Sequence, residues 1–209
     1  MVLSRIQKFS HPHSKIGSIF TILIITFACY LPALFNHFVN YDDPILIFEN
    51  TIIHHFSIKN IFHIFDEILT GHYSRFNPLV FVTYMIVHHL AGFNAFWFHA
   101  VNICFHLATT IIVFVLAKEI TNNHRLSFIC AILFGIHPIH VEPVVWISAL
   151  THGIYTFFYL FSVYMYCASQ HSKQNKPFLL CLSFFLFWIA GMCFSAGALT
   201  LPAVLLLLT

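Results

Sequence analysis

Two adjacent aspartates, Asp42 and Asp43, are the residues of this 209-residue chain best suited to chemistry. Only 8% of the chain is charged, and the pair follows directly after the first long apolar run. Crowding two carboxylates beside a membrane costs free energy that packing does not require, so the pair indicates a functional site. It can serve as a general base for an acceptor hydroxyl, or bind a hard divalent cation through oxygen. The alternative is a hydrated turn, because Asp-Pro steps such as Asp43-Pro44 are common in turns.

A second polar group follows the third apolar run and consists of His137, His140 and Glu142. The spacing is not the helical i, i+4 pair of a zinc protease, and Pro138 and Pro143 break the helix, so no metal site is predicted. The simplest interpretation is that these residues end a helix at the membrane surface. Contact with the aspartates is the intermediate possibility.

Three polar residues, His99, Asn102 and His106, fall at i, i+3 and i+7 of another apolar run. Lipid cannot satisfy such a stripe, so it must face protein or a wet cavity. Hydrogen bonding between helices is one reading, and lining of a substrate site is the other. We include His99 and Asn102 among the predicted substrate-binding residues.

The elements that position these groups are membrane helices. A mean hydropathy of +0.85 and 26 phenylalanines predict an all-α polytopic membrane protein. A crossing needs about 20 apolar residues. The predicted crossings, about five, are 18–35, 96–117, 126–138, 144–168 and 178–194. The run 198–208 is too short to cross, so we expect residues 18–209 to form a partial membrane domain with an incomplete last helix.

The run 78–91 is shorter and carries two histidines, so its placement depends on charge. If it lies along the outer interface, the basic residues of the later loops are on the cytoplasmic side together with those of the N-terminus, as the positive-inside rule requires. This predicts a cytoplasmic segment 1–17, an uncleaved anchor and an external loop 36–94. Within that loop, Ser57 caps a predicted one-faced interfacial helix over 57–69, with Gly71 as its stop.

Charge and cysteine content exclude other classes. The net charge is only +2 and no basic run is dense enough to follow a phosphate backbone, so nucleic acid is not an expected partner. The six cysteines show no paired spacing and are interpreted as small core residues.

The order of several motifs resembles a known family. The motifs are Phe38-Val39-Asn40-Tyr41-Asp42-Asp43-Pro44, Glu49-Asn50, Asn77-Pro78-Leu79, Thr83-Tyr84, Gly92-Phe93-Asn94, the stripe 99–106, 133–142 with Trp146, and Leu199-Thr200-Leu201-Pro202. Between about Phe38 and Leu208 the chain resembles the membrane part of bacterial glycosyltransferase-like proteins that carry tetratricopeptide repeats. These are relatives of the animal transmembrane O-mannosyltransferases.

The resemblance implies a partial GT-C glycosyltransferase fold whose first external loop carries the catalytic acidic pair. It implies extracytoplasmic transfer of a sugar from a polyprenyl-phosphate carrier to a protein hydroxyl, with Asp42 or Asp43 as the base. Asn50, His137, His140 and Glu142 become expected substrate-binding residues. No cofactor is implied with certainty, although a divalent cation fits the acidic pair.

Two departures from the family pattern predict weak or absent activity. Ala149-Leu150-Thr151-His152 replaces a charged run, and Ser195-Ala196 replaces a Lys-Pro step. The missing basic residues are those expected to bind the carrier phosphate. The later helices and repeats of the family are also not in this sequence.

Two further functions compete with the enzyme. A non-catalytic membrane module could assemble with a partner polypeptide that supplies further helices. A small transporter or channel lined by the stripe is the third option, but no inverted repeat supports it. The expected location is a bacterial inner membrane, or the endoplasmic reticulum in a eukaryote.

Overall fold

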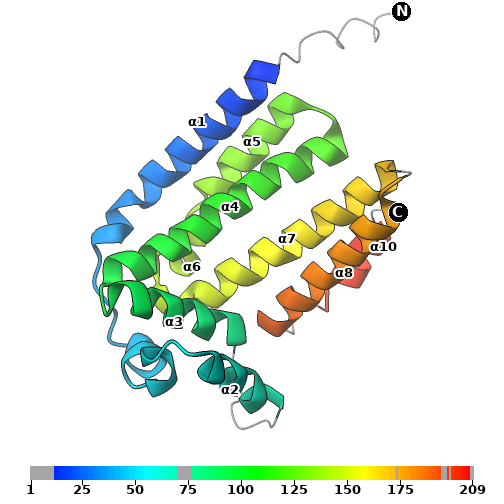
Figure 1. Ribbon diagram of the computed structural model, residues 1–209. Coiled ribbons are helices and arrows are strands. Elements are labelled where there is room, and N and C mark those ends of the chain that lie inside the picture. Colours follow the sequence, from blue (N-terminus) through cyan, green and yellow to red (C-terminus); the bar gives the residue numbers. More distant parts are fainter. Residues whose placement is uncertain (1–11, 70–76, 173, 194–196, 198, 208–209) are drawn as a thin grey trace, which may run out of the picture.

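The computed structural model describes residues 12–69, 77–172, 174–193, 197 and 199–207, and these form helices and turns without any strand. The long helices lie side by side, and the shorter elements of the first loop gather at one end of them (Figure 1). The helices of the bundle are α1 (Pro12–Tyr30), α4 (Ala95–Thr121), α5 (His124–Gly135), α7 (Leu150–His171), α8 (Lys176–Cys193) and α10 (Leu201–Leu207). The first loop contains η2 (Leu31–Phe35), η3 (Pro44–Phe48), η4 (Thr51–His54), α2 (Ile58–Leu69) and α3 (Pro78–Ala91).

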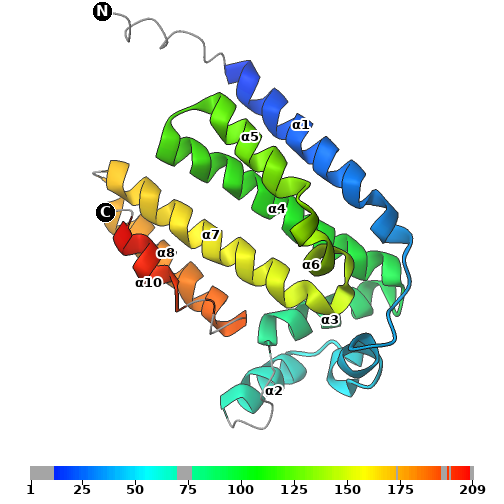
Figure 2. The same ribbon diagram turned by 180° about the vertical axis from the view of Figure 1, so that it is seen from behind.

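Helix α4 is central to the bundle. It contacts α1 and α5 on one side and α7 on the other, and α7 in turn lies between α4 and α8 (Figure 2). Buried serines join α7 to α8: the Ser162 hydroxyl donates to the Ser183 carbonyl at 2.7 Å, and Ser183 donates back to the Ser162 carbonyl at 2.8 Å. These two hydroxyls therefore find partners inside the bundle, as a lipid environment demands.

The tight turn between α4 and α5 follows from two asparagines. Asn122 takes a left-handed conformation with φ of 50°, which asparagine tolerates better than most residues. Asn123 caps α5, because its side-chain oxygen accepts the amides of Arg125 and Leu126. The two helices consequently run antiparallel and pack closely.

Among the residues that the structure describes, two helices are long and apolar enough to cross a membrane: Ile16–Phe35 and Ala95–Thr121. A third is added if His124–Gly135 and Pro138–Val145, which are bent by 46°, count as one span. Helix α7 has 22 residues but includes four tyrosines and polar ends, and Lys176–Met192 is a shorter apolar helix. The predicted number of about five crossings is not confirmed, and it stays a prediction together with the sidedness of the loops.

The predicted crossing 144–168 is wrong at its beginning. Short turns, α6 (Val141–Val145) and η6 (Ile147–Ala149), precede α7, which begins at Leu150. Trp146 has an extended backbone with ψ of 123°, which ends α6, and Asn102 and Tyr84 stabilise this break by donating to the Trp146 and Ile147 carbonyls at 2.8 Å each.

The cysteine interpretation is also wrong in part. Cys167 is buried, but Cys29, Cys104 and Cys181 are exposed on the outer faces of their helices. Large apolar side chains are exposed beside them, including Phe20 of α1 at 65% and Phe184 of α8 at 70%. Such a surface suits lipid, in which a small apolar thiol is as stable outside the bundle as inside it.

The first loop is fixed to the bundle by a buried apolar cluster. Ile47, Ile53 and Ile64 of the loop pack with Met85 of α3 and Ile147 of η6, and each is fully buried. As predicted, Ser57 caps α2 by accepting the Asn60 amide at 3.1 Å. Gly71, the predicted stop of this helix, lies outside the described residues.

Gly135 supplies a test of the packing of α1, α4 and α5. A methyl group at this position would overlap the Thr26 hydroxyl of α1 and approach Thr110 Cγ2 of α4 to 3.2 Å. We expect Gly135→Ala to lower the free energy of unfolding by about 1–3 kcal/mol, because the buried threonines must move. Thermal unfolding in a mild detergent measures this.

Gly17→Ala is the matched control, since nothing lies within 4 Å of that position. Alanine there should leave the midpoint unchanged or raise it, because alanine favours a helix interior. Equal midpoints for the two variants would contradict the close approach at Gly135.

Candidate functional site

The Asp43 carboxylate is the centre of the candidate site, and it is fully buried at 0% exposure. One oxygen accepts the Val39 amide at 2.7 Å, and the other accepts the hydroxyl of Ser148 from η6. Both carboxylate oxygens thus have a donor, which is the condition for keeping such a group inside a protein. The contact with Ser148 joins segments that are 105 residues apart in the sequence.

Asp42 differs from its neighbour. Its side chain is half-buried, and no hydrogen bond to its carboxylate is found among the described residues. Its backbone carbonyl accepts the Leu46 amide at 2.9 Å, which continues the chain into η3. The pair therefore consists of one carboxylate fixed in the interior and one that an approaching molecule can reach.

Tyr84 and Asn102 set the position of Ser148. The buried Tyr84 hydroxyl donates to the Ile147 carbonyl, and the Asn102 side-chain amide donates to the Trp146 carbonyl. Burial, together with the nearby Asp43 carboxylate, raises the pKa of Tyr84 above its ordinary value, so the phenol stays a neutral donor. These bonds hold the turn between α6 and α7 against α3 and α4.

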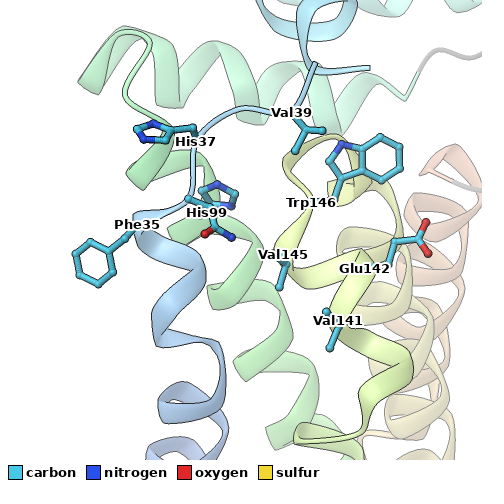
Figure 3. Close-up of a pocket in the computed structure, with 9 residues that line it drawn as sticks. Phe35, His37, Val39, His99, Val141, Glu142, Val145 and Trp146 are labelled. Carbon is cyan, nitrogen blue, oxygen red and sulfur yellow. The ribbon is translucent and has the colours of Figure 1, made fainter. Parts of the chain in front are cut away.

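A cavity of about 450 Å³ lies beside Asp43, where η2 and the following segment face α4 and α6 (Figure 3). Val39, whose amide bonds to Asp43, forms part of its wall. The residues that line it are Phe35, Asn36, His37, Val39, His99, Val141, Glu142, Val145 and Trp146. Its size is within the usual range for small-molecule sites, about 300–1,000 Å³.

His99 and Trp146 bring unpaired polar atoms to this cavity. The His99 side chain is 1% exposed, and neither of its ring nitrogens has a hydrogen-bond partner in the described part of the chain. The Trp146 indole nitrogen is likewise buried and unpaired there. Figure 3 places His99 between η2 and α6, with the nitrogen edge of the Trp146 indole turned toward it and the Glu142 carboxylate turned away. Buried polar atoms without partners are uncommon and require an explanation.

His137 and His140 lie apart from this cavity. His137 is exposed, and its ring nitrogen accepts the Ile139 amide at 3.2 Å. The His140 ring packs against Phe134, with 4.4 Å between ring centroids. It lines a smaller cavity of about 60 Å³ together with Asn102 and His106.

The predicted stripe and Asn50 have structural contacts. The His106 ring bonds to the Gly135 carbonyl at 2.9 Å, and the Asn102 side chain donates to the Trp146 carbonyl. Both bonds join α4 to another element, which was one of the two interpretations of the stripe. Asn50 caps η4 by accepting the Ile52 amide at 3.2 Å. Of the predicted site residues, His99 and Glu142 line this cavity and the Asp42-Asp43 pair lies beside its wall at Val39, whereas Asn50, Asn102, His137 and His140 lie elsewhere.

The arrangement offers little to a metal ion. Within the described ranges, no group of three or more histidine, cysteine, aspartate or glutamate side chains could hold one. A cation bound by the acidic pair would therefore take its other ligands from water or substrate.

Three residues of the site had no predicted role: Ser148, Tyr84 and Trp146. Tyr84 and Trp146 belong to the motifs of the resemblance, which was the only signal for them in the sequence. Ser148 carried no signal, because nothing in the local sequence relates a serine after a broken helix to an aspartate on the first loop.

The helices and the apolar surface define an all-helical membrane protein. The chain is similar to the mouse (Mus musculus) protein named Protein O-mannosyl-transferase TMTC1, with 33% identity over 88 residues. The match covers 38% of this chain and only 9% of the mouse protein. No protein-family model matches the chain, and no solved structure matches it significantly. This weak similarity supports at most a relation between the chain and the family of the mouse protein, which is named as a glycosyltransferase.

The bond between Asp43 and Ser148 gives a prediction on stability. Ser148→Ala leaves a buried carboxylate oxygen without its donor, so we expect the free energy of unfolding to fall by about 1–3 kcal/mol. Denaturation of the purified protein in detergent measures the loss.

A double-mutant cycle with Asp43→Asn is the control. If the two side chains interact as described, the two effects are not additive, and the double variant loses less than the sum of the single losses. Additive losses would contradict the contact.

Proposed function

We propose that this chain is a glycosyltransferase-like membrane protein that transfers a sugar from a polyprenyl-phosphate carrier to a protein hydroxyl on the extracytoplasmic side, at a low rate because it lacks the basic residues of the family pattern. The observation that carries the proposal is the acidic pair beside the cavity: Asp43 is fixed by two hydrogen bonds, and Asp42 next to it is accessible. The similarity to the mouse O-mannosyl-transferase supports the reaction class.

Asp42 is the general base in this proposal. Its carboxylate is half-buried and free of hydrogen bonds within the described residues, so an acceptor hydroxyl can approach it. Asp43 is a positioning residue, because its oxygens already accept Val39 and Ser148 and it is closed to solvent. Fixing Asp43 fixes the backbone of its neighbour, which places the base before the substrate arrives.

The reaction is a displacement at the anomeric carbon of the sugar. The acceptor oxygen forms a bond to this carbon as its proton passes to Asp42, and the bond from the carbon to the phosphate oxygen breaks. The electron pair leaves with the lipid phosphate. Attack from the opposite side inverts the anomeric centre. The phosphate is a good leaving group, so the main demand on the protein is a base for the hydroxyl.

The position of the acidic pair next to an apolar helix supports the proposal. The apolar helix Ile16–Phe35 ends directly before the loop that carries the acidic pair, and the cavity begins at Phe35. A lipid-linked substrate can therefore keep its chain in the apolar phase while its head group reaches the cavity.

Asp42→Asn tests the proposal. We expect the variant to fold as the wild type does, because its side chain makes no bond in the described structure, and to transfer sugar 10²–10⁴-fold more slowly, a range of ~3–5 kcal/mol in the barrier. The assay follows transfer of radiolabelled mannose from a polyprenyl-phosphate mannose to serine- and threonine-containing peptides by the full chain in lipid nanodiscs.

Asp66→Asn is the matched control, since Asp66 is an exposed aspartate on α2 of the same loop. It should transfer at the wild-type rate. Transfer by the Asp42→Asn variant at that rate, or no transfer by the wild type with any polyprenyl-phosphate sugar, would overturn the proposed function.

A further inference from the structure

The cavity beside His99 contains polar atoms that the proposed reaction has not used. Resting on the proposed function, we infer that this cavity binds the uncharged hexosyl ring of the donor, with His99 and Trp146 as its hydrogen-bonding residues, and that the carrier phosphate lies outside it. The inference concerns the ligand class of the cavity and is separate from the role of Asp42.

The donors and acceptors of the cavity match those of a sugar. A neutral imidazole has one donor and one acceptor, and an indole has one donor. Neither nitrogen of His99 nor the indole nitrogen of Trp146 makes a hydrogen bond of good geometry in the described structure, although backbone carbonyls of Asn36, His37 and Val145 lie around the His99 ring. A sugar hydroxyl both donates and accepts, so neighbouring hydroxyls can satisfy all three atoms. Phosphate oxygens mainly accept, and would leave the acceptor nitrogen of His99 unpaired.

The charges around the cavity also oppose a phosphate. Glu142 is a lining residue, and the Asp43 carboxylate acts electrostatically on the His99 ring from the neighbouring site. None of the nine lining residues is lysine or arginine. A phosphate placed near the Asp43 carboxylate, with no cation in the cavity wall, is unfavourable, whereas a neutral ring is not.

The wall of the cavity can admit a ligand. Asn36, His37 and Val39 belong to an extended segment between η2 and the acidic pair, and these three residues are exposed. The ring nitrogens of His99 are covered in the free protein, so the ligand must displace part of this segment to reach them. Val39 bonds to Asp43, and entry of the sugar is therefore coupled to the position of the acidic pair.

Isothermal titration calorimetry with two short-chain probes tests the inference on the full chain in detergent. The probes are citronellyl phosphate mannose and citronellyl phosphate, which differ only in the sugar. We expect the wild type to bind the first about 10-fold or more tightly than the second, as one or two hydrogen bonds imply. His99→Leu and Trp146→Phe should each remove this difference by weakening only the sugar-bearing probe.

His63→Leu is the control, since His63 is an exposed histidine on α2, and it should bind both probes as the wild type does. His99→Gln retains a donor and an acceptor and should recover most of the affinity lost in His99→Leu. Equal wild-type affinities for the two probes would overturn the inference, and so would unchanged discrimination in Trp146→Phe and the His99 variants.

Binding is measured without an acceptor, which separates this inference from the proposed function. Asp42→Asn should bind both probes as the wild type does. Tighter binding of the sugar-bearing probe without any sugar transfer would contradict the proposed reaction and support the sugar site. Transfer that depends on Asp42 but not on His99 would support the reaction and contradict the sugar site.

Discussion

A single carboxylate, Asp43, connects the parts of this protein that sequence keeps far apart. It is closed to solvent and accepts one bond from the backbone at Val39 and one from the hydroxyl of Ser148. In an apolar surrounding an ionised group without such donors would be strongly destabilising, so the loop and the turn before α7 must keep their relative position. The same contact therefore fixes where the accessible Asp42 and the wall of the cavity lie.

The rest of the structure serves this contact at two levels. The isoleucines of the first loop, including Ile47 and Ile53, are buried against α3 and η6. This hydrophobic packing holds the loop on the bundle, but it is non-directional and does not fix one orientation. Tyr84 and Asn102 then supply direction, because each donates to a carbonyl of the turn at 2.8 Å. Apolar packing brings the segments together, and the buried hydrogen bonds select one arrangement.

Much of this could be read from the sequence, and the failures have physical causes. The helical class and the cap at Ser57 follow from local composition and spacing. The start of α7 was misplaced because the backbone is extended at Trp146, in a turn that side chains of the distant α3 and α4 stabilise. The number of spanning helices stays a prediction, since apolarity alone does not distinguish a helix facing lipid from a shorter one packed on its neighbours. Ser148 could not be found, because its partner lies 105 residues away.

Amide hydrogen exchange at Val39 tests the central role of Asp43 most directly. This amide lies in an exposed, extended segment, so its bond to the Asp43 carboxylate at 2.7 Å is what protects it. The account predicts slow exchange at Val39 in the wild-type protein and fast exchange in Asp43→Ala, with the amides within α4 unchanged. Exchange at Val39 that is already fast in the wild type, or that is equally slow in Asp43→Ala, would contradict it.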